Sequence, residues 1–403
     1  MCENIVAFHK TVRGYRHIQE EIPCQDSSSS FEMNQRDGYQ IICVADGHGD
    51  PACHRSDVGS KFATEIAETC LKEFAESLLS GDMPFAYPRQ QYECMEQLTN
   101  TIISKWYGAI RNDLLENKVT EEDFLESGRY EESYRKGNRL EHLYGTTLIA
   151  ALRVKNYLIL IQQGDGRCDV FYTDGTVDQP IPWDSRCKGS TTTSMCDRDV
   201  FTSIRRAVID LKKNDVIACF VGSDGVEDSY FDNEETQLGT HRFYMDLCCK
   251  LCEYGTKGFQ YYLDDMLPGF SSTGSGDDIS VAGIVVLDKV LQHVDSFAEK
   301  VKKYDLEAKL KKDLEEAQAK VISMSRKHGI LSVKVADAET ALNTAKDADE
   351  TIIHELELKL ETVKKEFAEF DKRYRHNEAE KARLVNELIA LRGEDKHNEI
   401  PSK

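Results

Sequence analysis

The pattern of hydrophobic and polar positions divides the chain into two unlike parts. Up to residue 288, short apolar runs such as YQIICVA at residues 39–45 alternate with helical patterns and with turns that contain Gly and Asp. From Val290 onward, apolar residues recur every three or four positions between charged residues, and only Gly329 interrupts this pattern before Gly393. We therefore predict two domains, residues 1–288 and residues 289–403.

Residues 289–403 are predicted to form a long α-helical coiled-coil arm. Ala, Glu, Lys and Leu, which favour helices, dominate its composition. A repeat of about 3.5 residues between apolar positions is typical of a coiled coil. Such an arm implies self-association into a homo-oligomer or packing against a partner helix. The repeat begins at Leu310, Leu314, Ala317, Val321 and Met324.

Other arrangements of this region stay open. As one continuous helix, residues 290–392 would extend about 150 Å. The region could instead fold back as a helical hairpin, either near Gly329 or near the stretch NTAKDADET at residues 343–351. A solvated single helix with i,i+4 charge pairs is less favoured, because the apolar stripe persists.

The first part is predicted to be an α+β domain. Its strand-like runs follow one another along the chain while its helical patterns form separate blocks, which argues against alternating β-α-β units. The polar residues 117–141 are predicted to form a loop or a loosely packed helical insertion. Strand patterns occupy residues 39–45, 146–154, 157–166, 168–177, 215–225 and 277–287, and helical patterns occupy residues 56–79, 92–116 and 237–266.

The negative charge of the chain is concentrated in the first part. The formal net charge is −20 at pH 7, yet residues 289–403 carry 23 Lys+Arg and 24 Asp+Glu. Non-specific nucleic-acid binding needs clustered Lys and Arg, so this balance argues against a nucleic-acid partner.

Two further features favour a cytoplasmic protein without a membrane partner. No window approaches the ~18 consecutive apolar residues that cross a bilayer, and the first residues, MCENIVAFHKTVRG, lack the apolar core of a secretory signal. The 13 cysteines are odd in number and scattered, which fits reduced thiols better than a disulfide framework.

Aspartates stand at the ends of several apolar runs. Asp46 follows IICVA, Asp165 follows YLILIQQG and Asp224 follows VIACFVGS, whereas Asp277 precedes DISVAGIVV. Each Asp-Gly pair alone is a common turn. Carboxylates that converge at strand ends would repel one another unless a hard divalent cation such as magnesium or manganese bound there. The set therefore predicts a metal centre, although the spacing alone does not prove that the four carboxylates meet.

Five ordered motifs resemble those of the metal-dependent protein phosphatases, the PPM or type 2C family. They are VADGHGD, YGTTLIAAL, QQGDGRCDVF, VGSDGVEDS and GSGDDISVAGIVV, and the resemblance covers roughly residues 8–287. The opening IPCQDSS is similar to a branch common in bacteria that has Gln-Asp in its first motif. The resemblance implies a four-layer α/β/β/α sandwich, in which two antiparallel sheets are flanked by helices.

The resemblance also implies a set of metal ligands for manganese or magnesium. Asp46 would bridge two ions, and the Gly47 carbonyl would bind one of them. Asp224 and Asp277 would hold the other ion, and Asp165 matches an aspartate linked to a third, weaker one. His48 would be the general acid that protonates the leaving oxygen.

The first motif departs from the family pattern. Gln25 replaces an acidic residue that usually contacts metal through water, and Asp26 could take over that outer role. Asp278 replaces an asparagine next to the metal ligand Asp277. Glu21 stands near the position of the family's phosphate-binding arginine. Arg13, Arg16 or Arg55 could substitute for that arginine, and we choose Arg55 because it lies close to the metal motif.

The predicted function is metal-dependent hydrolysis of phosphoserine and phosphothreonine in a phosphoprotein substrate, by a water that two metal ions activate. Gln25 and the displaced arginine keep an alternative open, a pseudophosphatase scaffold with weak or no activity that acts through its coiled coil. A phosphatase of small molecules is a second alternative. The chain's signalling role, partner kinase and substrate are not specified by the sequence.

Overall fold

The computed structural model describes residues 4–33, 38–189, 191–230 and 236–393. The chain divides into two compact units, Met1–Glu299 and Lys300–Lys403. The boundary predicted after Asp288 falls near the start of helix α9 (Leu287–Thr344), which continues from one unit into the other. Residues 394–403 of the predicted helical arm lie outside the described residues.

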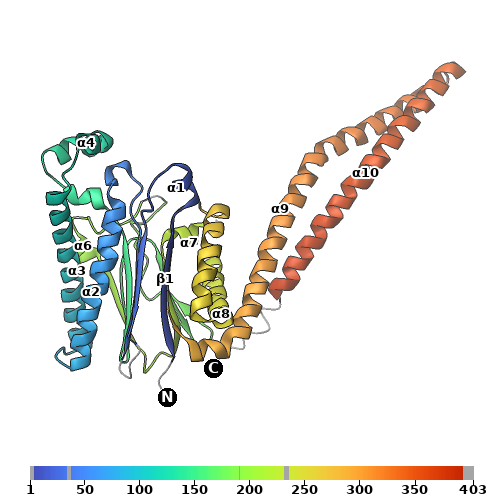
Figure 1. The fold of residues 1–403 in the computed structure, drawn as a ribbon. Helices are drawn as coiled ribbons and strands as arrows, with labels where there is room; N and C mark the ends of the chain where they lie inside the picture. Colours follow the sequence, from blue (N-terminus) through green and yellow to red (C-terminus); the bar gives the residue numbers. More distant parts are fainter. Residues whose placement is uncertain (1–3, 34–37, 190, 231–235, 394–403) are drawn as a thin grey trace. The chain divides into compact units, whose positions relative to one another are not determined.

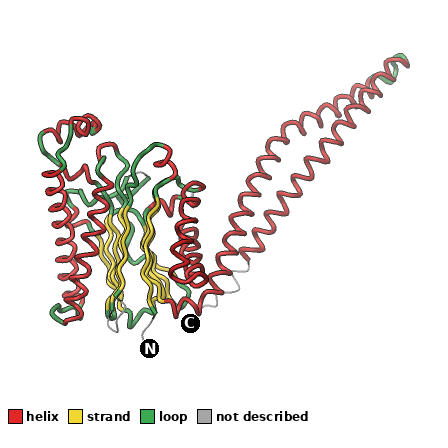
Figure 2. The backbone as a smooth tube through the Cα atoms, in the orientation of Figure 1, coloured by secondary structure: helices red, strands yellow, loops and turns green. Residues whose placement is uncertain are grey.

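The first unit is built on two antiparallel sheets (Figure 1). The strand orders are β1-β10-β9-β6-β7 and β2-β3-β4-β5-β8. Helices α2 (Ser56–Ser80) and α3 (Pro88–Glu116) cover one side of the sandwich and α8 (Thr236–Thr273) covers the other (Figure 2), which confirms the predicted four layers. The strands are β1 (Ile5–Val12), β2 (Ser27–Glu32), β3 (Tyr39–Ala45), β4 (Leu148–Val154), β5 (Tyr157–Gln163), β6 (Arg167–Tyr172), β7 (Val177–Asp178), β8 (Arg205–Asp210), β9 (Val216–Gly222) and β10 (Ile279–Val286).

The core explains why the central strands are mostly apolar at successive positions. Successive side chains of a strand point to opposite faces of the sheet. In β3, Ile42 and Val44 join the core between the two sheets, whereas Ile41 and Cys43 join the core beneath α2 and α3. Both faces are covered, so apolar residues are favoured at both sets of positions.

An aromatic layer fills the space between the first sheet and α8. The rings of Phe220 and Tyr244 stack with centroids 4.6 Å apart, and Phe8 meets Phe259 edge to face at 4.9 Å. Gly283 leaves room for these rings, because a Cβ there would lie 2.6 Å from Phe8. This layer fixes α8 against the strands that lead into the candidate site.

The polar stretch predicted as a loop or helical insertion is helical. It contains α4 (Glu121–Glu126) and α5 (Glu131–Arg135), separated by the short helix η2 (Gly128–Tyr130) and followed by η3 (Leu140–Tyr144). Tyr134 is fully buried and donates a hydrogen bond to the Ala52 carbonyl at 3.1 Å. The insertion is therefore packed onto the loop that follows β3. The other short helices of the first unit are α1 (Tyr15–Gln19), η1 (Pro51–Cys53), α6 (Val200–Ser203) and α7 (Asp224–Asp228).

The second unit is a helical hairpin. The later part of α9 packs antiparallel to α10 (Glu350–Gly393), and the chain reverses at residues 345–349. Glu307 pairs with Arg392 at 2.8 Å near one end, and Glu339 pairs with Lys364 at 2.7 Å near the other. The fold-back predicted at residues 343–351 is therefore confirmed, and a continuous helix over residues 290–392 is wrong.

The apolar seam of the arm is filled from within the chain. Leu310 and Ala317 of α9 form a small core with Leu384 and Leu388 of α10. His328, a polar residue on the seam, bonds to Asp371 at 2.7 Å and stacks on Tyr374. Within the described residues, no helix combines the length and apolar character needed to cross a membrane.

Candidate functional site

Strand ends bring acidic side chains to one end of the sandwich. Asp46 follows β3, Asp165 follows β5 and Asp224 follows β9, whereas Asp277 lies two residues before β10. The cross-strand registers align these ends within each sheet. Figure 1 shows α1 and α7 at this same end. The four aspartates singled out in the sequence therefore lie at one edge of the fold.

Asp46 and Asp224 are in direct contact. Their carboxyl groups share a hydrogen bond. Burial, and then the charges of Asp26 and Asp224, raise the pKa of Asp46 well above its usual value. Burial, together with the charges of Asp165 and Asp277, also raises the pKa of Asp224. Like charges held this close cannot all ionise without a cation, so the pair keeps a proton that a metal ion could displace.

Asp26 adds a buried carboxyl group to this cluster. Its side chain is only 8% exposed, and burial followed by the charge of Asp278 raises its pKa. One carboxyl oxygen, Oδ2, has no hydrogen-bond partner. An unpaired buried carboxyl oxygen is costly, and a cation or a cation-bound water is the chemistry that would satisfy it.

Backbone hydrogen bonds fix the position of Asp46. Its carbonyl accepts from the Thr147 N–H and from the Thr146 hydroxyl, both at 2.8 Å. Its own N–H donates to the Thr147 hydroxyl at 2.9 Å. The two threonines of the YGTTLIAAL motif thus hold the first turn of the site.

Gly47 is required by close packing. Its N–H donates to the Gln25 carbonyl at 3.1 Å. A Cβ at this position would lie 2.5 Å from that carbonyl oxygen and 2.7 Å from the Ser56 carbonyl oxygen. The Gln25 side chain, whose Nε2 donates to the Ser56 hydroxyl at 2.9 Å, closes the same contact. Gln25 therefore acts as a local brace beside the carboxylates.

Asp277 pairs with two side chains of α1. Its Oδ2 lies 2.6 Å from the guanidinium of Arg16, and its Oδ1 lies 3.6 Å from His17 Nε2. The Arg16 N–H also donates to the Gly276 carbonyl at 2.8 Å, which anchors α1 to this loop. The Arg16 side chain is 57% exposed, so its guanidinium stands at the open rim of the site.

Asp278 joins the first motif to the last. It accepts hydrogen bonds from the N–H groups of Gly14 and Gln25, both at 2.6 Å, and pairs with His17 Nδ1 at 2.9 Å. Burial raises the pKa of Asp278, but His17 and these N–H groups outweigh it and hold the pKa below its usual value. Asp278 in turn raises the pKa of His17. This charged, fully bonded aspartate positions the segment that carries Gln25 and Asp26.

His48 is packed against the turn before β4. Its N–H donates to the Gly145 carbonyl at 3.0 Å, and a Cβ on Gly145 would lie 2.6 Å from its ring. Burial, with a smaller effect from His142, lowers the pKa of His48 to about 4. The imidazole is therefore neutral at pH 7 in this structure, and service as a general acid requires that it gain a proton when substrate binds.

Asp165 lies under the connecting segment, which we define as residues 179–189 and 191–204 between β7 and β8. Burial raises the pKa of Asp165, and a hydrogen bond from Thr192 opposes this. The N–H of the preceding Gly164 donates to the Thr193 hydroxyl at 3.1 Å. The connecting segment is thus bound directly to the loop that carries Asp165.

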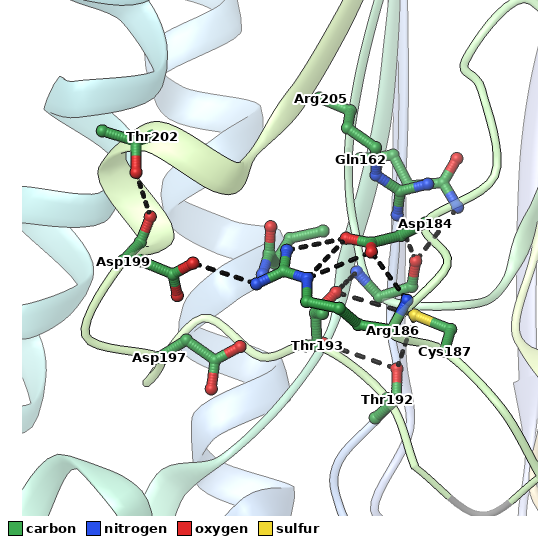
Figure 3. A network of polar contacts seen from close by, with 12 residues as sticks. Gln162, Asp184, Arg186, Cys187, Thr192, Thr193, Asp197, Asp199, Thr202 and Arg205 are labelled. Carbon is green, nitrogen blue, oxygen red and sulfur yellow. Dashed lines mark hydrogen bonds and ion pairs between the residues drawn. The ribbon is translucent and has the colours of Figure 1, made fainter.

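Arg186 braces the connecting segment internally (Figure 3). Its guanidinium pairs with Asp184 at 2.7 Å and with Asp199 at 2.9 Å. Arg205, at the start of β8, donates to the Pro182 carbonyl at 2.8 Å and also to the Gly164 carbonyl. These contacts give a polar segment without long helices or strands a defined shape.

The structure gives Arg55, chosen above for phosphate binding, a different set of partners. Its guanidinium donates to the Asn117 carbonyl at 2.7 Å, to the Tyr144 hydroxyl at 2.9 Å and to Asp123 at 3.1 Å. Its side chain is 13% exposed. Arg55 therefore ties the helical insertion to the start of α2. These partners lie 62 and 68 residues away in the sequence, so no local pattern indicated them, and phosphate binding by Arg55 stays a prediction.

The donor set suits a hard divalent cation. Within the described residues, no group of three or more His, Cys, Asp or Glu side chains is arranged to hold a metal ion. The carboxylates instead satisfy one another, in the Asp46–Asp224 contact, or pair with Arg16, as Asp277 does. Magnesium and manganese need few carboxylates because they keep several waters. The proton shared by Asp46 and Asp224 and the unpaired oxygen of Asp26 are consistent with such an ion.

Residues that no sequence motif marked as candidates also shape the site. His17 supports Asp277 and Asp278, and the hydroxyls of Ser223 and Ser280 bond to Asp26. Their types gave no signal, because serines near a turn and a histidine in a polar stretch are ordinary surface residues. Arg16 was one of three candidates for phosphate binding, and only its distance to Asp277 distinguishes it.

One family of known proteins matches most of the first unit. A sequence model of the family described as Protein phosphatase 2C matches residues 13–267. A search of curated proteins found no match.

Several solved structures are similar to this chain at low sequence identity. A serine/threonine phosphatase from S. agalactiae is 17% identical, covers 70% of this chain and 99% of its own, and has a TM-score of 0.42. The serine/threonine phosphatase Stp1 from Staphylococcus aureus is 16% identical, with 70% and 95% covered and a TM-score of 0.41. A C. elegans sex determining protein is 14% identical, with 72% and 67% covered and a TM-score of 0.44.

Proposed function

Because the chain belongs to the protein phosphatase 2C family, a family of protein serine/threonine phosphatases, we propose that it hydrolyses phosphoserine and phosphothreonine in proteins with the help of divalent metal ions. The observation that carries the proposal is the contact between the half-buried carboxyl groups of Asp46 and Asp224. Such a contact has no evident structural benefit, since two apolar residues of similar size would avoid the cost of burying charge.

The ligand roles are proposed from the geometry and the family together. Asp46 would contact two ions, the Gly47 carbonyl and Asp224 would each contact one, and Asp277 would contact the ion at Asp224. Asp165 would hold an additional ion under the connecting segment. When bound, manganese or magnesium supplies positive charge at the phosphoryl group and lowers the pKa of water.

The residues around these ligands have separate tasks. Asp278 keeps Gln25 and His17 in place through its hydrogen bonds. The unpaired oxygen of Asp26 would be available to accept a hydrogen bond from a metal-bound water. His48 would deliver a proton to the leaving serine or threonine oxygen. A substrate phosphate beside the neutral imidazole favours its protonated form, because an opposite charge raises the pKa of a histidine.

Arg16 is our candidate for phosphate binding in place of Arg55. Its guanidinium stands at the exposed rim and touches the proposed ligand Asp277. A cation bound at Asp277 would compete with Arg16 for the same oxygen. The released guanidinium could then bind two oxygens of a phosphate, for which its geometry is suited.

A pseudophosphatase scaffold is the competing function. It is favoured by the lack of a ready metal-holding group within the described residues and by the use of the Gln25 amide as a structural brace. In a scaffold of this kind, the helical arm would carry the function by binding a partner. In either case we propose that the arm docks a partner or a second copy, since its outer surface exposes Ile322 and Val333.

Initial rates decide between the enzyme and the scaffold. The full chain should hydrolyse p-nitrophenyl phosphate and phosphoserine or phosphothreonine peptides only with manganese or magnesium, and EDTA should abolish the rate. Hydrolysis of nucleotides and sugar phosphates but not of peptides would indicate a small-molecule phosphatase. No metal-dependent rate on any of these substrates would favour the scaffold. Light scattering tests the association of the arm. If the arm binds a second copy, the full chain should have the mass of an oligomer, whereas a chain ending at Glu299 should have the mass of a single chain.

A further inference from the structure

Arg167 lies between a helix of the candidate site and the connecting segment. It begins β6, two residues after Asp165. Its Nε and Nη2 donate to the two carboxylate oxygens of Glu227, each at 2.5 Å. Its guanidinium carbon Cζ lies over the ring of Trp183 in the connecting segment, 4.2 Å from the ring centroid. One side chain thus touches both elements.

The pair with Glu227 acts on the helix that carries Asp224. Glu227 is in α7, three residues after Asp224, and both side chains of the pair are largely buried, with 16% and 14% exposed. A helix as short as α7 is not stable by itself and takes its orientation from its contacts. A bidentate arginine–carboxylate pair fixes orientation as well as distance.

The contact with Trp183 acts on the connecting segment. Trp183 is 47% exposed, and the guanidinium of Arg167 lies over its ring. Cation–π contacts of this kind are strongest for tryptophan. The same segment bonds to Asp165 through Thr192, and its position therefore bears on two of the proposed metal ligands.

We propose that Arg167 is a positioning residue that couples the connecting segment to the proposed metal ligand Asp224, through its bidentate pair with Glu227 and its cation–π contact with Trp183. The inference rests on the proposed function, since it needs a cation at Asp224. Coupling is reciprocal: metal binding at Asp224 shifts the environment of Trp183, and loss of the Arg167 contacts weakens metal binding.

The tryptophan content of the chain makes the coupling measurable without substrate. The chain has two tryptophans. Trp106 is fully buried beneath α2, where its Nε1 donates to the Gly59 carbonyl at 3.0 Å. A metal-dependent change in emission should therefore come from Trp183, and Trp183→Phe should remove it.

The experiment titrates the metal-free full chain with magnesium while tryptophan emission is recorded, and measures manganese binding by electron paramagnetic resonance. Wild type should bind manganese and show a metal-dependent emission change. Arg167→Lys keeps the positive charge but loses the guanidinium that makes two hydrogen bonds to Glu227. The variant should therefore bind manganese about 10- to 100-fold more weakly, which is the usual effect of losing a group that orients a ligand. Even at saturating magnesium, Arg167→Lys should lack the metal-dependent change in tryptophan emission.

Two variants serve as controls. Arg186→Lys removes a similar guanidinium from the same segment, but the pairs of Arg186 are with Asp184 and Asp199 and not with a proposed metal ligand or its helix. Manganese affinity and the emission change should therefore match wild type. Glu227→Gln should weaken manganese binding like Arg167→Lys, and the double variant should add little to either single change. Glu227→Gln also covers the case in which Arg167→Lys does not fold.

The failures are distinguishable. If wild type binds manganese and both Arg167→Lys and Glu227→Gln bind it equally well with an unchanged emission response, the coupling is overturned while the proposed function stands. If Arg186→Lys weakens binding as much as Arg167→Lys, a general loosening of the segment replaces the specific role of Arg167. If wild type binds neither metal, the proposed function and this inference fail together.

Discussion

The guanidinium of Arg16 lies 2.6 Å from the carboxylate of Asp277, 261 residues away in the chain. This contact joins α1 to the loop before β10 and occupies an oxygen that the proposed metal site needs. It identifies Arg16 as a positive group within reach of whatever binds at the strand ends. It also implies that metal binding and Arg16 compete for Asp277.

Arg16→Ala should lower kcat/KM for p-nitrophenyl phosphate by about 10- to 100-fold, mainly through a higher KM. Hydrogen bonds to charged groups contribute about 1.5–3 kcal/mol each, and each 1.4 kcal/mol is about tenfold. The same variant should bind manganese more tightly, because Asp277 loses its competing partner. Arg16→Lys should lie between wild type and Arg16→Ala. An unchanged KM together with unchanged metal affinity would show that Arg16 only anchors α1.

Arg55→Ala should reduce stability and leave the KM for p-nitrophenyl phosphate close to wild type. Its partly buried guanidinium bonds to Asn117, Tyr144 and Asp123, and leaving these groups unpaired should cost about 2–3 kcal/mol. Urea unfolding measures the loss, and faster proteolysis within residues 117–141 should accompany it. A large rise in KM with unchanged stability would instead restore Arg55 as the phosphate ligand.

His48 should make the stability of the metal-free protein depend on pH. Burial lowers its pKa to about 4 in the folded state, whereas an unfolded histidine has a pKa of about 6.5. Between these values the unfolded state binds more protons, so stability falls as the pH drops through this window. Urea unfolding at pH 7.5 and pH 5 should show a smaller loss for His48→Gln than for wild type. Equal losses in the two proteins would mean that His48 is not the buried, neutral group described above.

The start of α9 should belong to the first unit. Val290 and Phe297 are buried, Phe297 lies 6.2 Å from Phe171, and Lys289 pairs with Asp215 at 2.7 Å. A chain ending at Glu299 should therefore unfold with the same midpoint as the first unit of the full chain. A chain ending at Asp288 loses Phe297 and Val290 and should be less stable by at least about 3–5 kcal/mol. Equal stability of the two shortened chains would place the boundary where the sequence pattern put it.

The sequence indicated the strands that are buried on both faces, because burial on both faces produces a recognisable apolar run. β3 and β9 are covered on both faces, so their apolar runs stand out. β2, with the sequence SSSSFE, is an edge strand whose serine hydroxyls bond to neighbours such as Thr11 and Thr64. No apolar pattern marks it. β8 (RRAVID) is likewise an edge strand with mostly half-buried residues.

The features that the sequence did not predict depend on contacts between residues far apart in the chain. The repeat in the arm predicted helices, but a seam of this spacing is filled equally well by a second helix of the same chain or by a partner. Motif order indicated the acidic cluster because each aspartate lies within two residues of a strand end. The partners of Arg55 and Arg16 depend on which distant loops the fold brings together, and no local pattern records that.

Manganese binding to the metal-free full chain tests the central claim, that Asp46 and Asp224 hold a divalent cation. Calorimetry with wild type should show binding, and Asp46→Asn and Asp224→Asn should each weaken it by more than about 100-fold, beyond the usual effect of removing a supporting group. Asp50→Asn is the matched control, because the side chain of Asp50 caps the short helix η1 through the Ala52 N–H, and it should bind as wild type does. Wild-type protein that binds no manganese, or variants at Asp46 and Asp224 that bind it as tightly as Asp50→Asn, would contradict the account.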